Sequence, residues 1–164
     1  WQEYDSKPEL NPREDQDGRE LRFEIAQEWR VKNTDLVLRG GYYHEHDSRE
    51  GQDLEFDRNG VFFGFRYKLP LEIFLSGRID YSRANFTNQN SRLLFRNLSD
   101  TFPFEAESPG ERKDTDLIFG VQLSRQIMDG LDLTIYHTTY DEESNVNEYD
   151  YDRSIWGSAL TYRF

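Results

Sequence analysis

Residues 21–31 read LRFEIAQEWRV, and apolar and polar side chains alternate along this stretch. Leu, Phe, Ile, Trp and Val fall on one side of the alternation, while Arg, Glu, Ala, Glu and Arg fall on the other. Because successive side chains of a β-strand point to opposite faces of its sheet, the pattern predicts a strand with one apolar and one charged face. One such strand also fits a soluble β-sandwich, so the length and number of the repeats must decide the class.

The alternation recurs along the whole chain, and the runs are mostly about 9–11 residues long, the length that a tilted strand needs to cross the hydrocarbon core of a bilayer. Apolar residues on one side, polar residues on the other and aromatic residues near the ends are typical of an outer-membrane β-barrel. A soluble antiparallel sandwich is the alternative, but it offers no reason for charges on the second face of each strand. The further runs lie within residues 36–45, 61–69, 71–81, 116–124, 131–136 and 156–164.

The connections between these runs alternate in length. Residues 32–35, Pro70 and residues 128–130 predict tight turns, because they are rich in turn-forming types. Long polar stretches lie between them, at residues 46–58, 84–114 and 141–152. Short turns at one rim and long extracellular loops at the other are the arrangement of these barrels. We therefore predict one all-β domain over residues 1–164, an antiparallel up-and-down transmembrane β-barrel with about 7–8 strands present.

The composition excludes several other classes of protein. Only 35% of residues are hydrophobic, whereas soluble globular domains have about 45–50%. Aromatic residues nevertheless make up 15%, which argues against a disordered chain despite the net charge of -12. The acidic balance disfavours nucleic acid as a partner, and the absence of cysteine excludes disulfides and thiolate metal sites. No run approaches the roughly 18 apolar residues of a transmembrane helix.

The closing segment, residues 149–164, resembles the C-terminal strand of Gram-negative outer-membrane β-barrels. In that family a terminal Phe, preceded by aromatic or apolar residues at alternate positions, is recognised by the barrel-assembly machinery. Ser158 departs from this pattern, and the specific match covers about the last ten residues. The Tyr-Asp-Arg and Tyr-Arg-Phe tripeptides are also loosely similar to barrels of exopolysaccharide-export operons. The matching residues, which the resemblance makes the assembly signal, are Trp156, Leu160, Tyr162 and Phe164.

The resemblance implies a multi-pass protein of the cell outer membrane, in contact with lipid and lipopolysaccharide, with a periplasmic C-terminus. Counting strands back from that end places the start of the strand at 19–31 at the outer rim. Residues 1–18 are then an external segment, unless residues 1–4 are the remnant of a shortened opening strand. Two alternatives stay open: an eight-stranded barrel with a short first strand, or the C-terminal part of a larger barrel. In the second, which we favour, further strands or a partner subunit complete the wall.

A set of residues of both charge signs is predicted to face the lumen. In a narrow barrel these residues would pair and close the interior, because unpaired buried charge is costly. In a wide barrel they would line water and select solutes. We therefore expect a pore or export channel for polar solute or polymer, with a small closed barrel of structural or adhesive role as the alternative. The predicted lumen residues are Arg22, Glu24, Glu28, Arg30, Arg39, Arg66, Lys68, Arg78 and Asp80.

Catalytic residues are not predicted. His46, Asp47 and Ser48 have the three side-chain types of a hydrolase triad, but adjacent strand positions cannot converge as a triad does, so a barrel lipid hydrolase is the least supported class. His44, His46 and His137 are interpreted as residues at the bases of loops. No cofactor is expected except a weak Ca²⁺ candidate, since this ion takes oxygen ligands. Its ligands would be Asp141, Glu143, Asn145 and Asn147, and the alternative is an ordinary solvated loop.

The 84–114 stretch is too apolar for a freely solvated loop. Exposed apolar patches of this kind are usually sites of contact. We expect it to fold back into the lumen, with capping of the mouth and contact with a partner subunit as alternatives. Its large apolar residues are Phe86, Leu93, Leu94, Phe95, Phe102 and Phe104.

Overall fold

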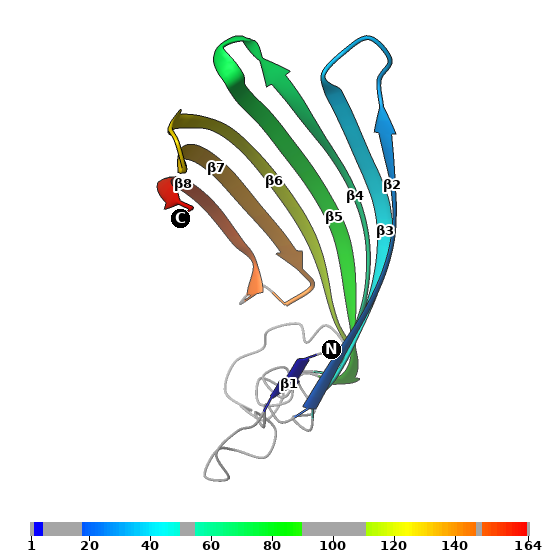
Figure 1. Cartoon of the computed structure of the whole chain (residues 1–164). Coiled ribbons are helices and arrows are strands. Elements are labelled where there is room, and N and C mark those ends of the chain that lie inside the picture. Colours follow the sequence, from blue (N-terminus) through cyan, green and yellow to red (C-terminus); the bar gives the residue numbers. More distant parts are fainter. Residues whose placement is uncertain (1, 5–17, 50–54, 90–110, 147–148, 164) are drawn as a thin grey trace.

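A single curved sheet makes up the computed structural model, which describes residues 2–4, 18–49, 55–89, 111–146 and 149–163. Each strand pairs antiparallel with the next along the chain, in the order β1 to β8 (Figure 1). The all-β, antiparallel up-and-down prediction is confirmed. The strands are β1 (Gln2–Tyr4), β2 (Gly18–Arg30), β3 (Leu36–Arg49), β4 (Phe56–Leu69), β5 (Ile73–Gln89), β6 (Glu111–Met128), β7 (Leu131–Ser144) and β8 (Tyr151–Tyr162), with a 3-10 turn η2 (Pro70–Glu72) between β4 and β5.

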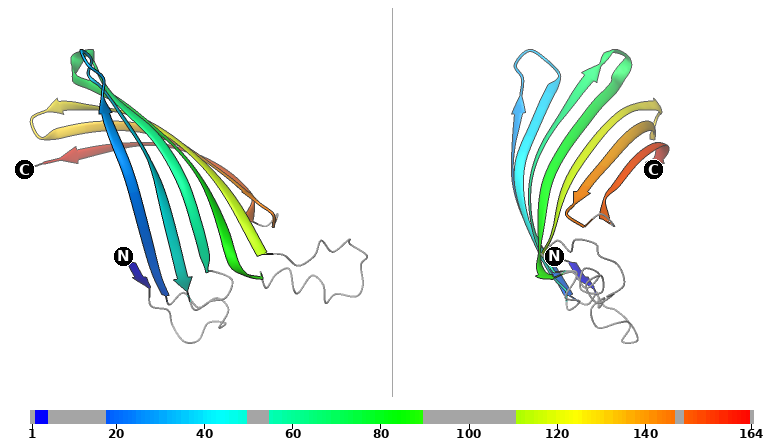
Figure 2. Two further views of the ribbon diagram at one scale, coloured as in Figure 1. Left: turned by 90° about the vertical axis from the view of Figure 1, so that its right-hand side faces the viewer. Right: turned by 180° about the vertical axis from the view of Figure 1, so that it is seen from behind.

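The sheet forms an open curved wall, as the two further views show (Figure 2). Within the described ranges no strand pairs with the outer edge of β8, so the sheet does not close on itself. At the other edge β1 pairs with β2 over three residues only, from Gln2↔Glu20 to Tyr4↔Gly18. Residues 2–4 are therefore a short paired strand at this edge of the sheet.

The strands are longer than the sequence predicted, and the loops are correspondingly shorter. β2 to β8 contain between 12 and 18 residues, and they extend into the predicted loops at 46–58, 84–114 and 141–152, where strands reach Arg49 and Phe56, Gln89 and Glu111, and Ser144 and Tyr151. Phe56, for example, pairs with both Asp47 and Phe86. The prediction was wrong here because both faces become polar toward these strand ends. The hydrophobic alternation then disappears, although the backbone ladder continues.

The tight turns are confirmed at the opposite ends of the strands. Asn33 in the first turn and Leu71 in η2 have positive φ values of 60° and 62°. Gly130, between β6 and β7, has a φ of 77°, a conformation that glycine adopts without steric cost. A Cβ there would also approach the Arg163 carbonyl oxygen to 2.5 Å, so the turn requires glycine for both reasons.

The register separates the sheet into two chemically different faces. One, which we call the apolar face, carries large side chains that remain exposed, with exposed fractions such as 58% for Phe23 and 74% for Trp156. A soluble sandwich would cover such a face with a second layer, and the described chain has none (Figure 2). Its main members are Leu21, Phe23, Ile25, Trp29, Leu38, Tyr42, Val61, Phe63, Phe65, Tyr67, Ile79, Tyr81, Leu117, Phe119, Leu123, Ile135, Trp156, Leu160 and Tyr162.

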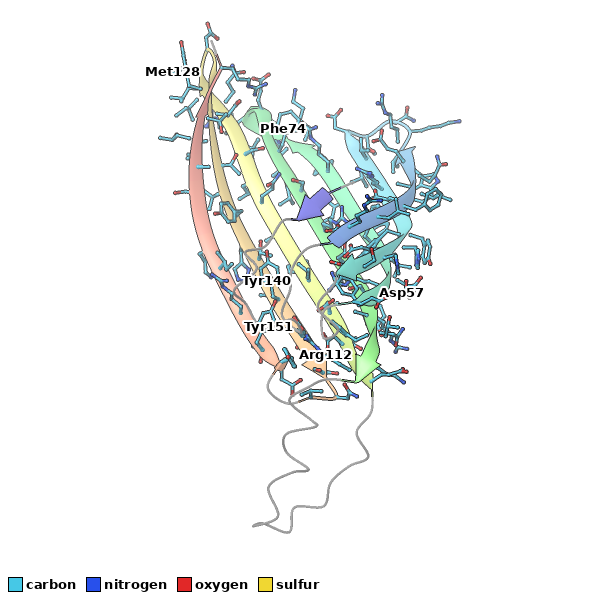
Figure 3. The ribbon with its side chains drawn as sticks, turned by 90° about the horizontal axis from the view of Figure 1, so that it is seen from below. Asp57, Phe74, Arg112, Met128, Tyr140 and Tyr151 are labelled. Atoms are coloured by element: carbon cyan, nitrogen blue, oxygen red, sulfur yellow. The ribbon has the colours of Figure 1, made fainter. Side chains whose placement is uncertain are left out.

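The other face, the polar face, lies on the concave side of the wall. Arg112, Tyr140 and Tyr151 belong to it and point into the hollow, whereas Asp57 belongs to the opposite face (Figure 3). The buried side chains gather on the polar face because curvature crowds its residues together. On this face they are Tyr43, Glu45, Asp47, Phe62, Ser82, Ala84, Phe86 and Asp114, and Val146, after the end of β7, is buried as well. The described residues form no helix that is long and apolar enough to span a membrane.

Candidate functional site on the polar face

The residues predicted to face the lumen share one face of the sheet. Direct cross-strand partners include Arg22↔Glu45 and Glu28↔Arg39 between β2 and β3. The chain of partners continues from Arg39 through Gly64 to Arg78 across β4 and β5. By this register Arg22, Glu24, Glu28, Arg30, Arg39, Arg66, Lys68, Arg78 and Asp80 all lie on the polar face.

At the loop end of the polar face, Glu45 is the centre of a network of ion pairs. Its carboxylate lies 3.3 Å from the Arg22 guanidinium and 3.5 Å from that of Arg58, and only 7% of its side chain is exposed. Arg58 Nε is in turn 3.6 Å from Asp116, which accepts a 2.9 Å hydrogen bond from the Ser82 hydroxyl. The network therefore crosses β2, β3, β4, β5 and β6.

Arg112 organises a second group on the same end of the face. It donates to Asp114 at 2.9 Å and to Glu142 at 3.4 Å. Its guanidinium lies 4.3 Å from the ring centroid of Phe86 and 3.4 Å from that of Tyr149. Stacking on aromatic rings restricts the plane of the guanidinium and favours the cation electrostatically.

We call this loop-proximal region the acidic end, because its carboxylates outnumber its arginines. The sequence analysis missed most of it, since Arg58 and Arg112 fell within stretches assigned to loops. No hydrophobic period marks the beginning of β6, because Thr115 and Lys113 on one face are as polar as Asp114 and Arg112 on the other. The members of the acidic end are Glu20, Glu45, Asp47, Asp114, Asp116 and Glu142 with Arg22, Arg58 and Arg112.

Toward the turns, arginine dominates the polar face. Arg30, Arg39, Arg66 and Arg78 line a depression of about 400 Å³ together with Glu28. We call this region the arginine end. Guanidinium groups present several N–H donors in a planar fork and stay protonated at any physiological pH.

Tyr43 connects the two ends of the polar face. Its hydroxyl donates a 2.8 Å hydrogen bond to Asp80, whose other oxygen lies 2.6 Å from the Arg78 guanidinium. Arg22 of the acidic end lies 3.8 Å from the Tyr43 ring centroid. These contacts connect the two ends of the face, and the sign of the charge changes from negative near the loops to positive near the turns.

The histidines lie on the apolar face and do not form a triad. Near the loop end, His46 Nδ1 is 2.8 Å from Asp57, and His44 Nδ1 is 3.1 Å from the Asn59 side-chain oxygen. Asp47 lies on the opposite face from His46, so the three triad types are divided between the two sides of the sheet.

His137 lies in the middle of β7 rather than at the base of a loop, so that interpretation was wrong. Its ring stacks on Trp156 with centroids 4.0 Å apart, and its Nε2 is 2.8 Å from the Ser154 hydroxyl. The cross-strand pairing His137↔Trp156 creates this position. The distance of His137 from any turn follows from the strand lengths, which the sequence alternation had underestimated.

The oxygen-rich stretch near residue 141 is divided between strand and turn. Asp141 and Glu143 belong to β7 and point to the apolar side. The Asn145 side chain is engaged by the backbone, accepting from Lys113 N at 2.7 Å and donating to Glu111 O at 2.9 Å. Asn147 lies outside the described residues. Within the described ranges no three His, Asp or Glu side chains are grouped as a metal site.

The residues of the predicted assembly signal lie at the free edge of the sheet. Trp156, Leu160 and Tyr162 all project from the apolar face of β8, with exposed fractions of 74%, 66% and 61%. Phe164 lies outside the described residues. Arg163, directly after β8, contacts Asp132, and the hydrogen bond raises the pKa of its guanidinium above the usual value.

Phe86 is the one residue of the apolar 84–114 set that the structure describes. It lies in β5 on the polar face, 7% exposed, with its ring centroid 5.4 Å from that of Phe56. Phe86 is therefore a paired residue of the sheet and not part of a loop. Leu93, Leu94, Phe95, Phe102 and Phe104 lie outside the described residues.

Comparison with protein-family models, with curated proteins and with solved structures finds no match for this chain. The function must therefore be argued from the two faces of the sheet.

Proposed function

We propose that this chain forms the wall of a β-barrel in a Gram-negative outer membrane, and that its polar face lines a passage for a polar solute or polymer. The observation that carries the proposal is the separation of one curved sheet into an exposed apolar face and a charged concave face. In this proposal the apolar face contacts lipid and the polar face contacts water, as in a membrane barrel.

The height of the apolar face matches a bilayer. The alternation that begins at Leu21 and ends at Val31 spans about 33 Å at about 3.3 Å per residue. A strand tilt of about 40° reduces this to a band about 25 Å high, the value typical of outer-membrane barrels. The strands therefore cross the hydrocarbon and project beyond it at the loop end.

The border of this band is marked by side chains that are apolar along their body and polar at their tip. Tyr42 donates a 2.5 Å hydrogen bond to Asn59, and Arg83 donates a 2.7 Å bond to the Tyr81 hydroxyl. Tyr is enriched at membrane interfaces for this reason. Above the border the same face of β3 to β7 carries polar residues, including His46, Asp57, Asn85, Lys113 and Glu143.

A second candidate function is a closed barrel with a structural or adhesive role. The cross-strand network around Glu45 favours it, because ion pairs that span five strands could fill a narrow lumen as a plug. Strand number separates the two: the wall must gain strands, from the rest of a larger barrel or from a partner subunit, to leave an open lumen. The assembly machinery, lipid and lipopolysaccharide are the other partners proposed.

The test is conductance of the full chain, folded in detergent and added to planar lipid bilayers. A pore gives discrete current steps, and a plugged barrel inserts without them. Insertion is checked separately by protease protection in liposomes and by the mobility difference between unboiled and boiled samples. Phe119→Arg, which places a charge in the middle of the apolar face, is the matched control and should abolish both insertion and current. A wild-type chain that stays soluble and monomeric without detergent would contradict the membrane proposal.

A further inference from the structure

In the lining of the depression at the arginine end, positively charged side chains outnumber negatively charged ones. Four arginines and one glutamate contribute its charged lining, and Val37, Phe62 and the glycine Gly64 form the surface between them. Its volume of about 400 Å³ is large enough for one or two sugar rings or a small multivalent anion.

The four arginines are only partly neutralised by their neighbours. Arg39 pairs with Glu24 at 2.9 Å and Arg78 with Asp80 at 2.6 Å. Arg30 has a 3.4 Å contact with Glu28, but the two side chains are 84% and 52% exposed, so water screens this pair strongly.

Arg66 differs from the other three arginines. Within the described part of the chain it forms no ion pair, and its guanidinium lies 4.6 Å from the ring centroid of Phe74. Lys68, two residues along β4, lies 5.9 Å from the same ring. Arg66 therefore brings a positive charge to the depression that no described carboxylate offsets.

Aromatic rings hold the guanidinium groups in defined positions. Phe62 is 5% exposed, and Arg78 and Arg39 lie 4.1 and 5.5 Å from its ring centroid. A stacked guanidinium keeps its in-plane N–H donors available, which suits bidentate binding of an oxyanion. Pre-positioned donors lower the entropic cost of binding.

We propose that the arginine end is a binding subsite for an oxyanion group, a carboxylate, phosphate or sulfate, carried by the solute that occupies the passage. The inference rests on the proposed function in that the polar face must be accessible to solute. The opposite sign of the acidic end localises the anion to the turn side of the face. An acidic oligosaccharide and a small free anion share this chemistry, and both are used as probes.

The test is isothermal titration of the folded full chain in neutral detergent, at low and at physiological ionic strength. Tetragalacturonate represents the acidic oligosaccharide, inorganic phosphate the small anion, and maltotetraose the neutral oligosaccharide. We expect saturable binding of at least one anionic probe and none of maltotetraose. Binding of tetragalacturonate alone assigns the subsite to an acidic saccharide, and binding of phosphate with similar affinity assigns it to the oxyanion group itself.

Arg66→Gln is the decisive variant, because it removes the arginine without a described ion pair and leaves the other pairs intact. We expect at least a tenfold loss of affinity, the scale of a charged hydrogen bond, and a smaller loss for Arg66→Lys, which retains the charge without the fork. Arg153→Gln is the matched control, since it removes one positive charge from the same face on β8. It should change the affinity by less than about twofold at physiological salt, where the Debye length is about 8 Å.

Equal losses in Arg66→Gln and Arg153→Gln would overturn the inference, because binding would then follow net charge alone. Absence of saturable binding to both anionic probes in a chain shown to be folded would overturn it as well. A different result would contradict the pore alone. Selective, Arg66-dependent binding without current steps would support the subsite and reject the pore.

Discussion

The ring of Phe62 in β4 lies over Gly41, its cross-strand partner in β3, so closely that a Cβ at Gly41 would come within 2.6 Å of the Phe62 Cζ. The same arrangement recurs between the direct partners Gly60 and Tyr43, two residues along the same strand pair. In both cases the glycine leaves the space into which the neighbouring ring folds. The rings in turn support arginines: Arg78 on Phe62 and Arg22 on Tyr43. Glycine, aromatic ring and guanidinium thus form three successive layers on the polar face.

This layering predicts that Gly41→Ala destabilises the sheet. The added methyl group would meet the Phe62 ring and the Ile25 carbonyl oxygen at 2.5 Å, and overpacking of this kind costs about 1–3 kcal/mol. The free energy of unfolding can be measured by urea titration of tryptophan fluorescence in micelles. Gly120→Ala is the control, because a Cβ there meets only the Thr138 hydroxyl oxygen at 3.7 Å. Equal destabilisation by the two substitutions would contradict the role of the close approach.

Glu45→Gln tests the network of the acidic end. The substitution keeps the shape of the side chain but leaves Arg22 and Arg58 without their shared anion. Because those arginines are 39% and 30% exposed, water screens part of the loss, and we expect about 2 kcal/mol of destabilisation rather than the full value for a buried pair. Glu28→Gln removes a carboxylate from the exposed pair with Arg30 and should cost less than about 1 kcal/mol. The prediction fails if the two variants unfold at the same urea concentration.

Insertion into lipid should depend on where a charge is placed along the apolar face. Phe119→Arg lies in the middle of the predicted band, where an arginine facing lipid costs about 2–4 kcal/mol. Thr115→Arg lies on the same strand and the same face but beyond the band, beside Glu143, and should insert nearly as well as the wild type. The folded fraction in liposomes, followed by the unboiled gel mobility, distinguishes the two. Comparable insertion of both variants would mean that this face does not contact lipid.

The resemblance of the C-terminal strand predicts a difference between assembly in cells and folding in the test tube. Leu160→Ser disrupts the predicted assembly signal, whereas Leu133→Ser changes its cross-strand partner on the same face of β7. Both should lower the free energy of unfolding in micelles by similar amounts, since each replaces a leucine of the apolar face with serine. Only Leu160→Ser should strongly reduce the amount of folded protein in the outer membrane of expressing cells. Equal losses in cells would remove the support for a signal in β8.

Much of this architecture could be predicted from local sequence. The period of two in residues 21–31 assigns Phe23 and Glu24 to opposite faces without any knowledge of neighbouring strands. The turns at Asn33, Pro70 and Gly130 could be placed for the same reason, because their backbone conformations favour particular residue types. The strand ends near the loops could not be predicted, because the side chains on both faces of the sheet are polar there, such as Asp114 on one face and Lys113 on the other. These segments therefore lack the hydrophobic period of two.

The sequence by itself therefore determined that the sheet has one apolar and one charged face, because side-chain direction in an extended backbone depends only on neighbouring residues. The tertiary structure decided which charges meet. Arg112 and Glu142, or Arg78 and Phe62, lie far apart along the chain and become neighbours only through the register between consecutive strands. Register depends on turn geometry and on cross-strand packing such as that of Phe62 on Gly41. These long-range pairings separate the acidic end from the arginine end and create the depression between the arginines.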